Sequence, residues 1–84
     1  MKRYLVTVMR SPRFDAGLVP AHGAFLDGLR ERRQLELAGP FTDASGGAYL
    51  LLADDLQTAE ALAFTDPLHV SGSSAISVHE WNAR

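Results

Sequence analysis

The segment at residues 2–10, KRYLVTVMR, constrains the fold more than any other part of the chain. Its residues alternate as in a β-strand, with Tyr4, Val6 and Val8 on one face, yet the opposite face is also largely apolar. A second segment, AYLLLA at residues 48–53, contains no polar residue. Strands that are apolar on both faces have to be covered on both faces. The fold must therefore place a layer of structure on each side of these strands.

A helix is expected over residues 20–33, PAHGAFLDGLRERR. Pro20 suits the start of a helix, because the N–H group that proline lacks would have no intrahelical partner there. Phe25 and Leu29 belong to an apolar stripe, and His22 lies at helical spacing on the same side. His22 is therefore expected to face the core although its side chain can ionise.

Two further strands and a second helix are expected in the rest of the chain. LELAGPFT at residues 35–42 predicts a strand, and Pro40 places it at a sheet edge or a bulge because proline cannot donate to a ladder. DASGG at 43–47 is typical of a turn. LQTAEALAF at 56–64 predicts a helix, and AISVHEW at 75–81 predicts the last strand.

This βαββαβ order predicts a single domain of the α+β class over residues 1–84. It is the ferredoxin-like pattern, an antiparallel four-stranded sheet with two helices on one face. The helices leave the second face of the sheet open. A chain of this size buries only about 60–65% of its unfolded surface, so a partner would help it. We therefore expect a homodimer that packs sheet on sheet, a dimeric α+β barrel.

The composition narrows the classes of function. The absence of cysteine excludes disulfides, zinc–thiolate sites, iron–sulfur clusters and a cysteine nucleophile. The spacing of His22, His69 and His79 does not match a metal site, so we expect no metal and no other cofactor. The net charge of −2, the dispersed basic residues, and the lack of a signal-peptide core or long apolar run favour a cytoplasmic protein. We expect it to bind neither nucleic acid nor a membrane.

His22 and Asp66 are the candidate catalytic residues. The helix dipole disfavours a protonated His22 in the first helical turn, which leaves a neutral ring able to accept a proton. Asp66 precedes Pro67 and suits the cap of a short helical turn. The predicted helices share one face of the sheet, so the two side chains can meet, and a carboxylate on one ring nitrogen would fix the tautomer. The alternatives are a buried histidine satisfied by a backbone carbonyl and an aspartate that only caps a helix.

The order and spacing of several motifs resemble the YCII-related domain family of small bacterial proteins. These motifs are YLVTVM, PAH at 20–22, AGPF at 38–41, YLLLA, TAEALAF, DP at 66–67, Gly72 and a closing strand that ends in Trp81. The resemblance covers nearly the whole chain and implies a dimeric α+β barrel with a His–Asp active site, here His22 and Asp66. The glycine that usually ends the first helix in this family is Arg33 here, so the C-cap is expected to differ.

Some members of that family are dehydrochlorinases, so the resemblance implies proton abstraction. We therefore expect a cofactor-independent enzyme of the lyase, dehydrochlorinase or isomerase type that acts on a small organic substrate. His22 would move the proton and Asp66 would orient its ring. Gly39 would let backbone approach the ligand, Pro40 would shape the pocket rim, and Arg10 or Arg13 would attract an anionic group. The alternatives are a non-catalytic ligand-binding or regulatory dimeric domain and a purely structural dimerisation module.

Overall fold

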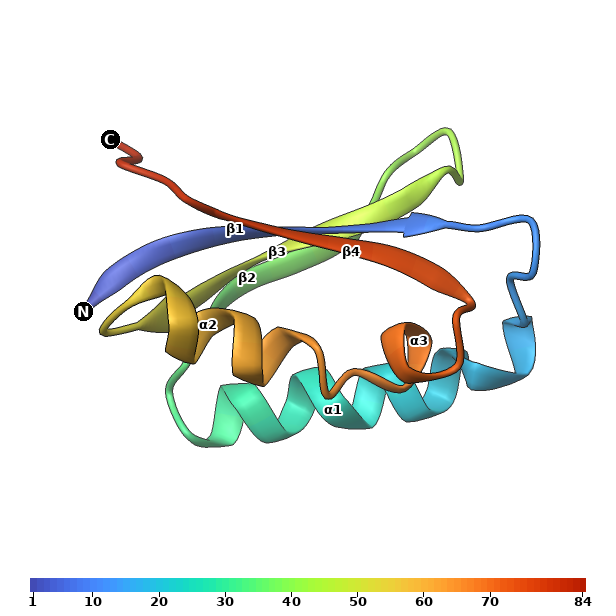
Figure 1. Ribbon diagram of the computed structural model, residues 1–84, viewed down its shortest axis with the longest axis horizontal. Helices are drawn as coiled ribbons and strands as arrows, with labels where there is room; N and C mark the ends of the chain where they lie inside the picture. Colours follow the sequence, from blue (N-terminus) through green and yellow to red (C-terminus); the bar gives the residue numbers. More distant parts are fainter.

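The computed structural model describes residues 1–84 and shows the βαββαβ order, with a short third helix before the last strand (Figure 1). The elements are β1 (Lys2–Arg10), a 3-10 turn (Ala16–Leu18), α1 (Val19–Glu31), β2 (Leu35–Pro40), β3 (Gly46–Ala53), α2 (Leu56–Ala63), α3 (Pro67–Val70) and β4 (Ser74–Glu80).

The four strands form one antiparallel sheet in the order β2-β3-β1-β4. All three helices lie on the same side of this sheet in Figure 1. The predicted α+β, ferredoxin-like architecture is therefore confirmed. β2 is an edge strand with a register shift between Leu35 and Leu37, and Pro40 lies at its end, where a missing N–H donor costs least.

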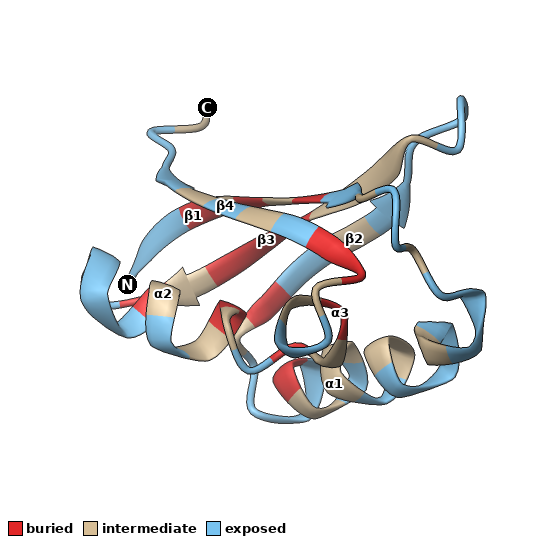
Figure 2. Ribbon diagram, turned by 45° about the vertical axis from the view of Figure 1, so that its right-hand side comes forward, coloured by how far each residue is buried: buried red, intermediate tan, exposed pale blue.

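The core lies between the sheet and the helices (Figure 2). Tyr4, Val6 and Val8 of β1 point into it, as their alternation predicted. Leu29 of α1 and Ala59 of α2 are fully buried against this face. The small alanines of α2 allow that helix to lie close to the strands.

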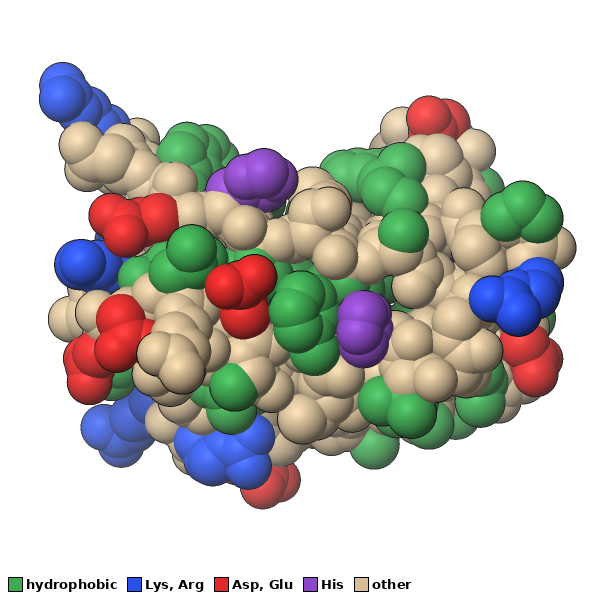
Figure 3. Space-filling model, viewed as in Figure 1, with side chains coloured by type: hydrophobic (Ala, Val, Ile, Leu, Met, Phe, Trp, Pro, Cys, Tyr) green, Lys and Arg blue, Asp and Glu red, His purple; other side chains and the backbone are tan.

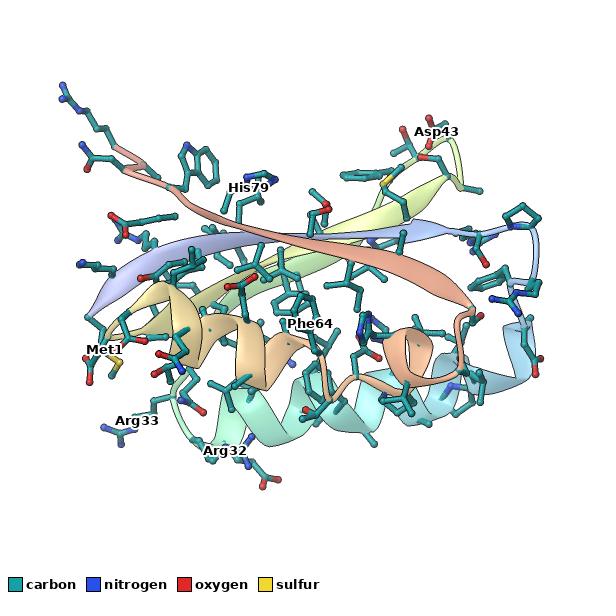
Figure 4. All side chains as sticks on the ribbon, viewed as in Figure 1. Met1, Arg32, Arg33, Asp43, Phe64 and His79 are labelled. Atoms are coloured by element: carbon teal, nitrogen blue, oxygen red, sulfur yellow. The ribbon has the colours of Figure 1, made fainter.

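The face of the sheet away from the helices is also apolar. The β-ladder places Leu5, Leu50 and Leu37 side by side across three strands, and Leu37 is exposed. His79 projects from β4 on this side, whereas Phe64 lies on the helix side (Figure 4). The sheet therefore has one covered face and one open apolar face.

The sequence misplaced several element boundaries. The turn expected at 43–47 is shorter, because Gly46 and Gly47 already belong to β3. A Cβ at Gly47 would lie 2.6 Å from the Gly39 carbonyl oxygen, so the close pairing of β2 and β3 requires a glycine there. The other ends differ by one or two residues: α1 spans 19–31 rather than 20–33, β2 ends at 40 rather than 42, α2 ends at 63 rather than 64, and β4 spans 74–80 rather than 75–81.

The C-cap of α1 was expected to differ from a glycine cap, and this expectation was wrong. Arg33 has φ 58°, the left-handed conformation that glycine usually supplies at this position. The Gln34 N–H donates to the Leu29 carbonyl at 2.9 Å and the Arg33 N–H to the Arg30 carbonyl at 3.0 Å. This is the hydrogen-bond pattern of a Schellman motif. The C-cap therefore keeps the geometry of a glycine cap, with an arginine bearing the strain.

Charged side chains of both signs are dispersed over the face shown in Figure 3, and the basic groups there do not merge into one surface. None of the helices has the length and apolar character needed to cross a membrane.

Candidate active site

His22 and Asp66 meet between α1 and α3. The His22 Nδ1 atom lies 2.7 Å from the Asp66 Oδ2 atom. The Asp66 side chain is fully buried, and that of His22 is 19% exposed. The second carboxylate oxygen, Oδ1, accepts the Leu68 N–H at 2.9 Å. Both oxygens of Asp66 thus have a donor, which is how a buried carboxylate is accommodated.

The local sequence explains how Asp66 reaches this position. Asp66 is the N-cap of α3, and Pro67 is the first helical residue, as the Asp-Pro pair predicted. Leu68 is buried and anchors the short helix to the core. α3 packs against α1, which brings Asp66 beside the first turn of α1, where His22 lies.

The hydrogen bond determines which nitrogen of His22 can act as a base. An ionised carboxylate only accepts hydrogen bonds, so the Nδ1 atom carries the proton that it donates to Asp66. The Nε2 atom of the neutral ring is then unprotonated. If Nε2 takes up a proton, the resulting imidazolium lies directly against the Asp66 carboxylate. The pair has the geometry of a general base supported by an orienting carboxylate.

A cavity of about 390 Å³ borders the imidazole and lies between α1 and the sheet. One face of α1 contributes Val19, His22, Gly23, Leu26 and Arg30, at spacings of three and four residues. Asp66 does not line the cavity. A ligand would therefore contact the imidazole, with the carboxylate behind it.

Three other predicted residues, Arg10, Gly39 and Pro40, also line this cavity. Pro40 pairs with Gly47 on the helix-facing side of β2, whereas Gly39 pairs with Ala48 on the alternate side. Gly39 therefore offers its backbone to the cavity. Arg13, considered with Arg10 as a source of positive charge, is absent from the lining.

Arg10 is a free cation at the cavity. Its guanidinium lies over the Phe14 ring, 4.2 Å from the centroid, and makes no ion pair. Arg30 also lines the cavity and lies 3.4 Å from the Asp27 carboxylate, with both side chains exposed. The interaction within such an exposed ion pair is weak, so Arg30 remains able to bind an anion. The cavity lining therefore contains two arginines, Arg10 and Arg30, and one carboxylate, that of Asp27.

Tyr49 and Ser74 were not predicted as site residues. Both line the cavity and are almost fully buried, and neither hydroxyl has a hydrogen-bond partner in the protein. Burial, followed by the negative charge of Asp66, raises the pKa of the Tyr49 hydroxyl. The only sequence signal was strand alternation, which puts Tyr49 opposite Val6 on the helix-facing side. Tyr49 also belongs to the hydrophobic core.

Neither of the other two histidines lines the cavity. His69 belongs to α3, and its ring stacks on Phe64 with 4.6 Å between centroids. His79 lies on β4, on the open side of the sheet (Figure 4).

Comparison with known proteins identifies the family. The model of the YCII-related domain matches residues 3–82. The uncharacterised protein YjpA of Bacillus subtilis (strain 168) is 42% identical over 84 residues, which are 100% of this chain and 99% of YjpA. The chain therefore belongs to the YCII-related domain family.

A solved structure supports the fold. The 5-chloro-2-hydroxyhydroquinone dehydrochlorinase TftG from Burkholderia phenoliruptrix AC1100, in complex with 2,5-dihydroxybenzoquinone, matches with a TM-score of 0.75. The match covers 98% of this chain and 95% of the TftG chain at 20% sequence identity. At that identity the similarity establishes a shared fold.

Proposed function

We propose that this protein is a cofactor-independent enzyme that uses His22 and Asp66 for general acid–base chemistry on a small organic substrate. The observation that carries the proposal is the 2.7 Å contact between His22 Nδ1 and Asp66 Oδ2 beside a cavity of about 390 Å³. A buried carboxylate that orients a half-buried imidazole is the arrangement that a general base requires. TftG, which has the same fold, is named as a dehydrochlorinase, and its structure is a complex with 2,5-dihydroxybenzoquinone, a small ring compound.

The proposed chemistry is an elimination or an isomerisation. The Nε2 atom of His22 takes a proton from a C–H bond of the substrate, and Asp66 stabilises the imidazolium. In an elimination, the electrons of that bond form a double bond, and a leaving group such as chloride departs with its bonding pair. In an isomerisation, the imidazolium returns the proton to a different atom of the same substrate.

The cavity residues would hold the substrate in place. Arg10 would attract an anionic group, because its guanidinium has no carboxylate partner. Pro40 would shape the rim on the β2 side, and the Gly39 backbone would pass close to the ligand. These contacts orient the substrate, while the proton transfer itself depends on His22.

We also propose that the protein is a cytoplasmic homodimer formed through the open face of the sheet. The row of Leu5, Leu50 and Leu37 would pack against the same row of a second copy. Leu37→Lys should therefore yield monomers in analytical ultracentrifugation. Leu56→Lys, at an exposed leucine of α2 on the other side of the sheet, should leave the assembly unchanged. A monomeric wild type, or a dimeric Leu37→Lys variant, would contradict the dimer.

A two-stage experiment tests the catalytic proposal. Thermal-shift screening of a metabolite panel that includes 2,5-dihydroxybenzoquinone should find ligands that raise the melting temperature. Small carbonyl and halogenated compounds related to the hits are then assayed for turnover. His22→Asn and Asp66→Asn should each abolish most turnover while still binding ligand. If both variants turn substrate over at the wild-type rate, the protein is not this kind of enzyme.

The alternative function, a non-catalytic ligand-binding or regulatory domain, predicts a different result. The two arginines and the apolar walls of the cavity do not depend on the His–Asp pair. A domain of that type would bind the same ligands without converting them, and His22→Asn would alter only affinity.

A further inference from the structure

Gly23 follows His22 in α1 and lines the same cavity. Its φ is not positive, so no special backbone conformation calls for glycine at this position. A Cβ added at Gly23 would find no heavy atom within 4 Å, so close packing does not call for glycine either. The missing side chain therefore leaves open space in the cavity beside the imidazole.

The glycine that leaves this space open lowers the stability of the helix. Gly23 is an interior residue of a helix of 13 residues, and glycine destabilises such a position relative to alanine. Gly28 of the same helix also has open space around an added Cβ, but it does not line the cavity. The two glycines are thus equivalent for the helix and differ in their relation to the cavity.

The cavity also indicates the type of ligand that would fill this space. Its volume of about 390 Å³ is at the low end of ligand sites and suits a compound of about one ring. Arg10 and Arg30 supply positive charge, and Val8, Val19, Leu26 and Leu68 supply apolar surface. A small flat ring with negative charge satisfies both features.

We propose that Gly23 determines substrate specificity by leaving the α1 backbone bare, so that the ring of a small organic anion can lie against the helix beside His22. The anionic group of this ligand lies toward Arg10. This inference rests on the proposed function, because it takes the cavity as the substrate site. It adds the class of substrate and names Gly23 as the residue that makes room for it. Gly23 positions the ring and takes no part in proton transfer.

Matched variants in one helix test this inference. Gly23→Ala and Gly28→Ala should both raise the melting temperature, because alanine favours the helix at either position. Absorbance titration with 2,5-dihydroxybenzoquinone, whose enol groups ionise at neutral pH, should show about tenfold weaker binding by Gly23→Ala. Gly28→Ala should bind like the wild type. The neutral ring hydroquinone should bind the wild type more weakly than the anionic probe does.

Three results would overturn the inference: no binding of the anionic probe by the wild type, equal affinity in the two alanine variants, or tighter binding of hydroquinone. The His22→Asn turnover assay separates this outcome from failure of the proposed function. Selective loss of affinity in Gly23→Ala, together with unchanged turnover in His22→Asn, would support the inference and refute only the catalytic proposal. Equal affinities of the alanine variants, with turnover lost in His22→Asn, would refute only the inference.

Discussion

Asp66 lies behind His22 as seen from the cavity: its Oδ2 atom contacts the His22 Nδ1 atom at 2.7 Å, and it has no surface on the cavity itself. A ligand in the cavity would therefore contact the imidazole and not the carboxylate. In the proposed mechanism, Asp66 therefore orients the ring and His22 reacts with the substrate.

Asp66→Asn should lower kcat/KM for an identified substrate by about 10²-fold or more. The side-chain oxygen of the asparagine can still accept the Leu68 N–H and so cap α3. Its NH2 group, however, can donate to Nδ1 and move the ring proton to Nε2, which removes the base. Steady-state kinetics together with a thermal melt check this expectation. A variant that is as active as the wild type would show that the tautomer is irrelevant to turnover.

Arg33→Gly should stabilise the protein by about 1 kcal/mol, because it relieves the left-handed conformation of a residue with a Cβ atom. Arg33 has φ 58°, whereas its neighbour Arg32 has an ordinary φ of −86°. Arg32→Gly is the matched control and should be destabilising. Chemical denaturation of both variants measures the difference, and similar effects of the two substitutions would contradict the cap geometry.

Asp55→Ala should lower the stability at neutral pH, because the Asp55 side chain accepts the Thr58 N–H at 2.7 Å and caps α2. This hydrogen bond holds the pKa of Asp55 below its usual value. Its contribution is therefore complete above the unfolded-state pKa of about 3.9 and disappears as the pH falls through the lower folded-state value.

Melting curves from pH 7 down to pH 3 measure the effect of Asp55. The difference between wild type and Asp55→Ala should narrow toward the acidic end. Asp54→Ala, at the neighbouring exposed aspartate, serves as the control and should have little effect. A difference that stays constant over this range would rule out the proposed coupling to the charge of Asp55.

Tyr49→Phe should leave the stability at pH 8 unchanged or raise it, because the hydroxyl that it removes is buried without a partner. The pKa of Tyr49 is raised by burial and by Asp66, so the wild-type contribution is complete below about pH 10. Above that pH the unfolded chain ionises first, and the wild type loses stability. Urea titrations from pH 8 to 11 should show a smaller loss for Tyr49→Phe. A parallel loss would contradict the raised pKa.

The architecture could be predicted because it depends on alternation and order. The alternation of residues 2–10 and the βαββαβ order predicted an antiparallel sheet with the helices on one face. The second covering layer, which the apolar residues on both faces of residues 2–10 and 48–53 call for, stays a prediction. The pairing of His22 with Asp66 followed from two local features, a helical stripe and a capping Asp-Pro, combined with two helices on one face.

The features that the sequence did not predict depend on distances between segments. Gly47 is in a strand rather than a turn because the Gly39 carbonyl of the neighbouring strand leaves no room for a Cβ. Tyr49 and Ser74 line the cavity because of how β3 and β4 are placed relative to α1, and the local pattern around each residue shows only burial. Arg33 adopts a conformation that its residue type disfavours, since the helix end and the start of β2 fix the chain there.

The His–Asp pairing stands or falls with the position of the proton on the His22 ring. A long-range ¹H–¹⁵N correlation spectrum at neutral pH identifies which ring nitrogen carries the proton. We expect the proton on Nδ1 and a bare Nε2, with this preference lost in Asp66→Ala. A proton on Nε2 in the wild type, or a ring signal that Asp66→Ala leaves unchanged, would contradict it.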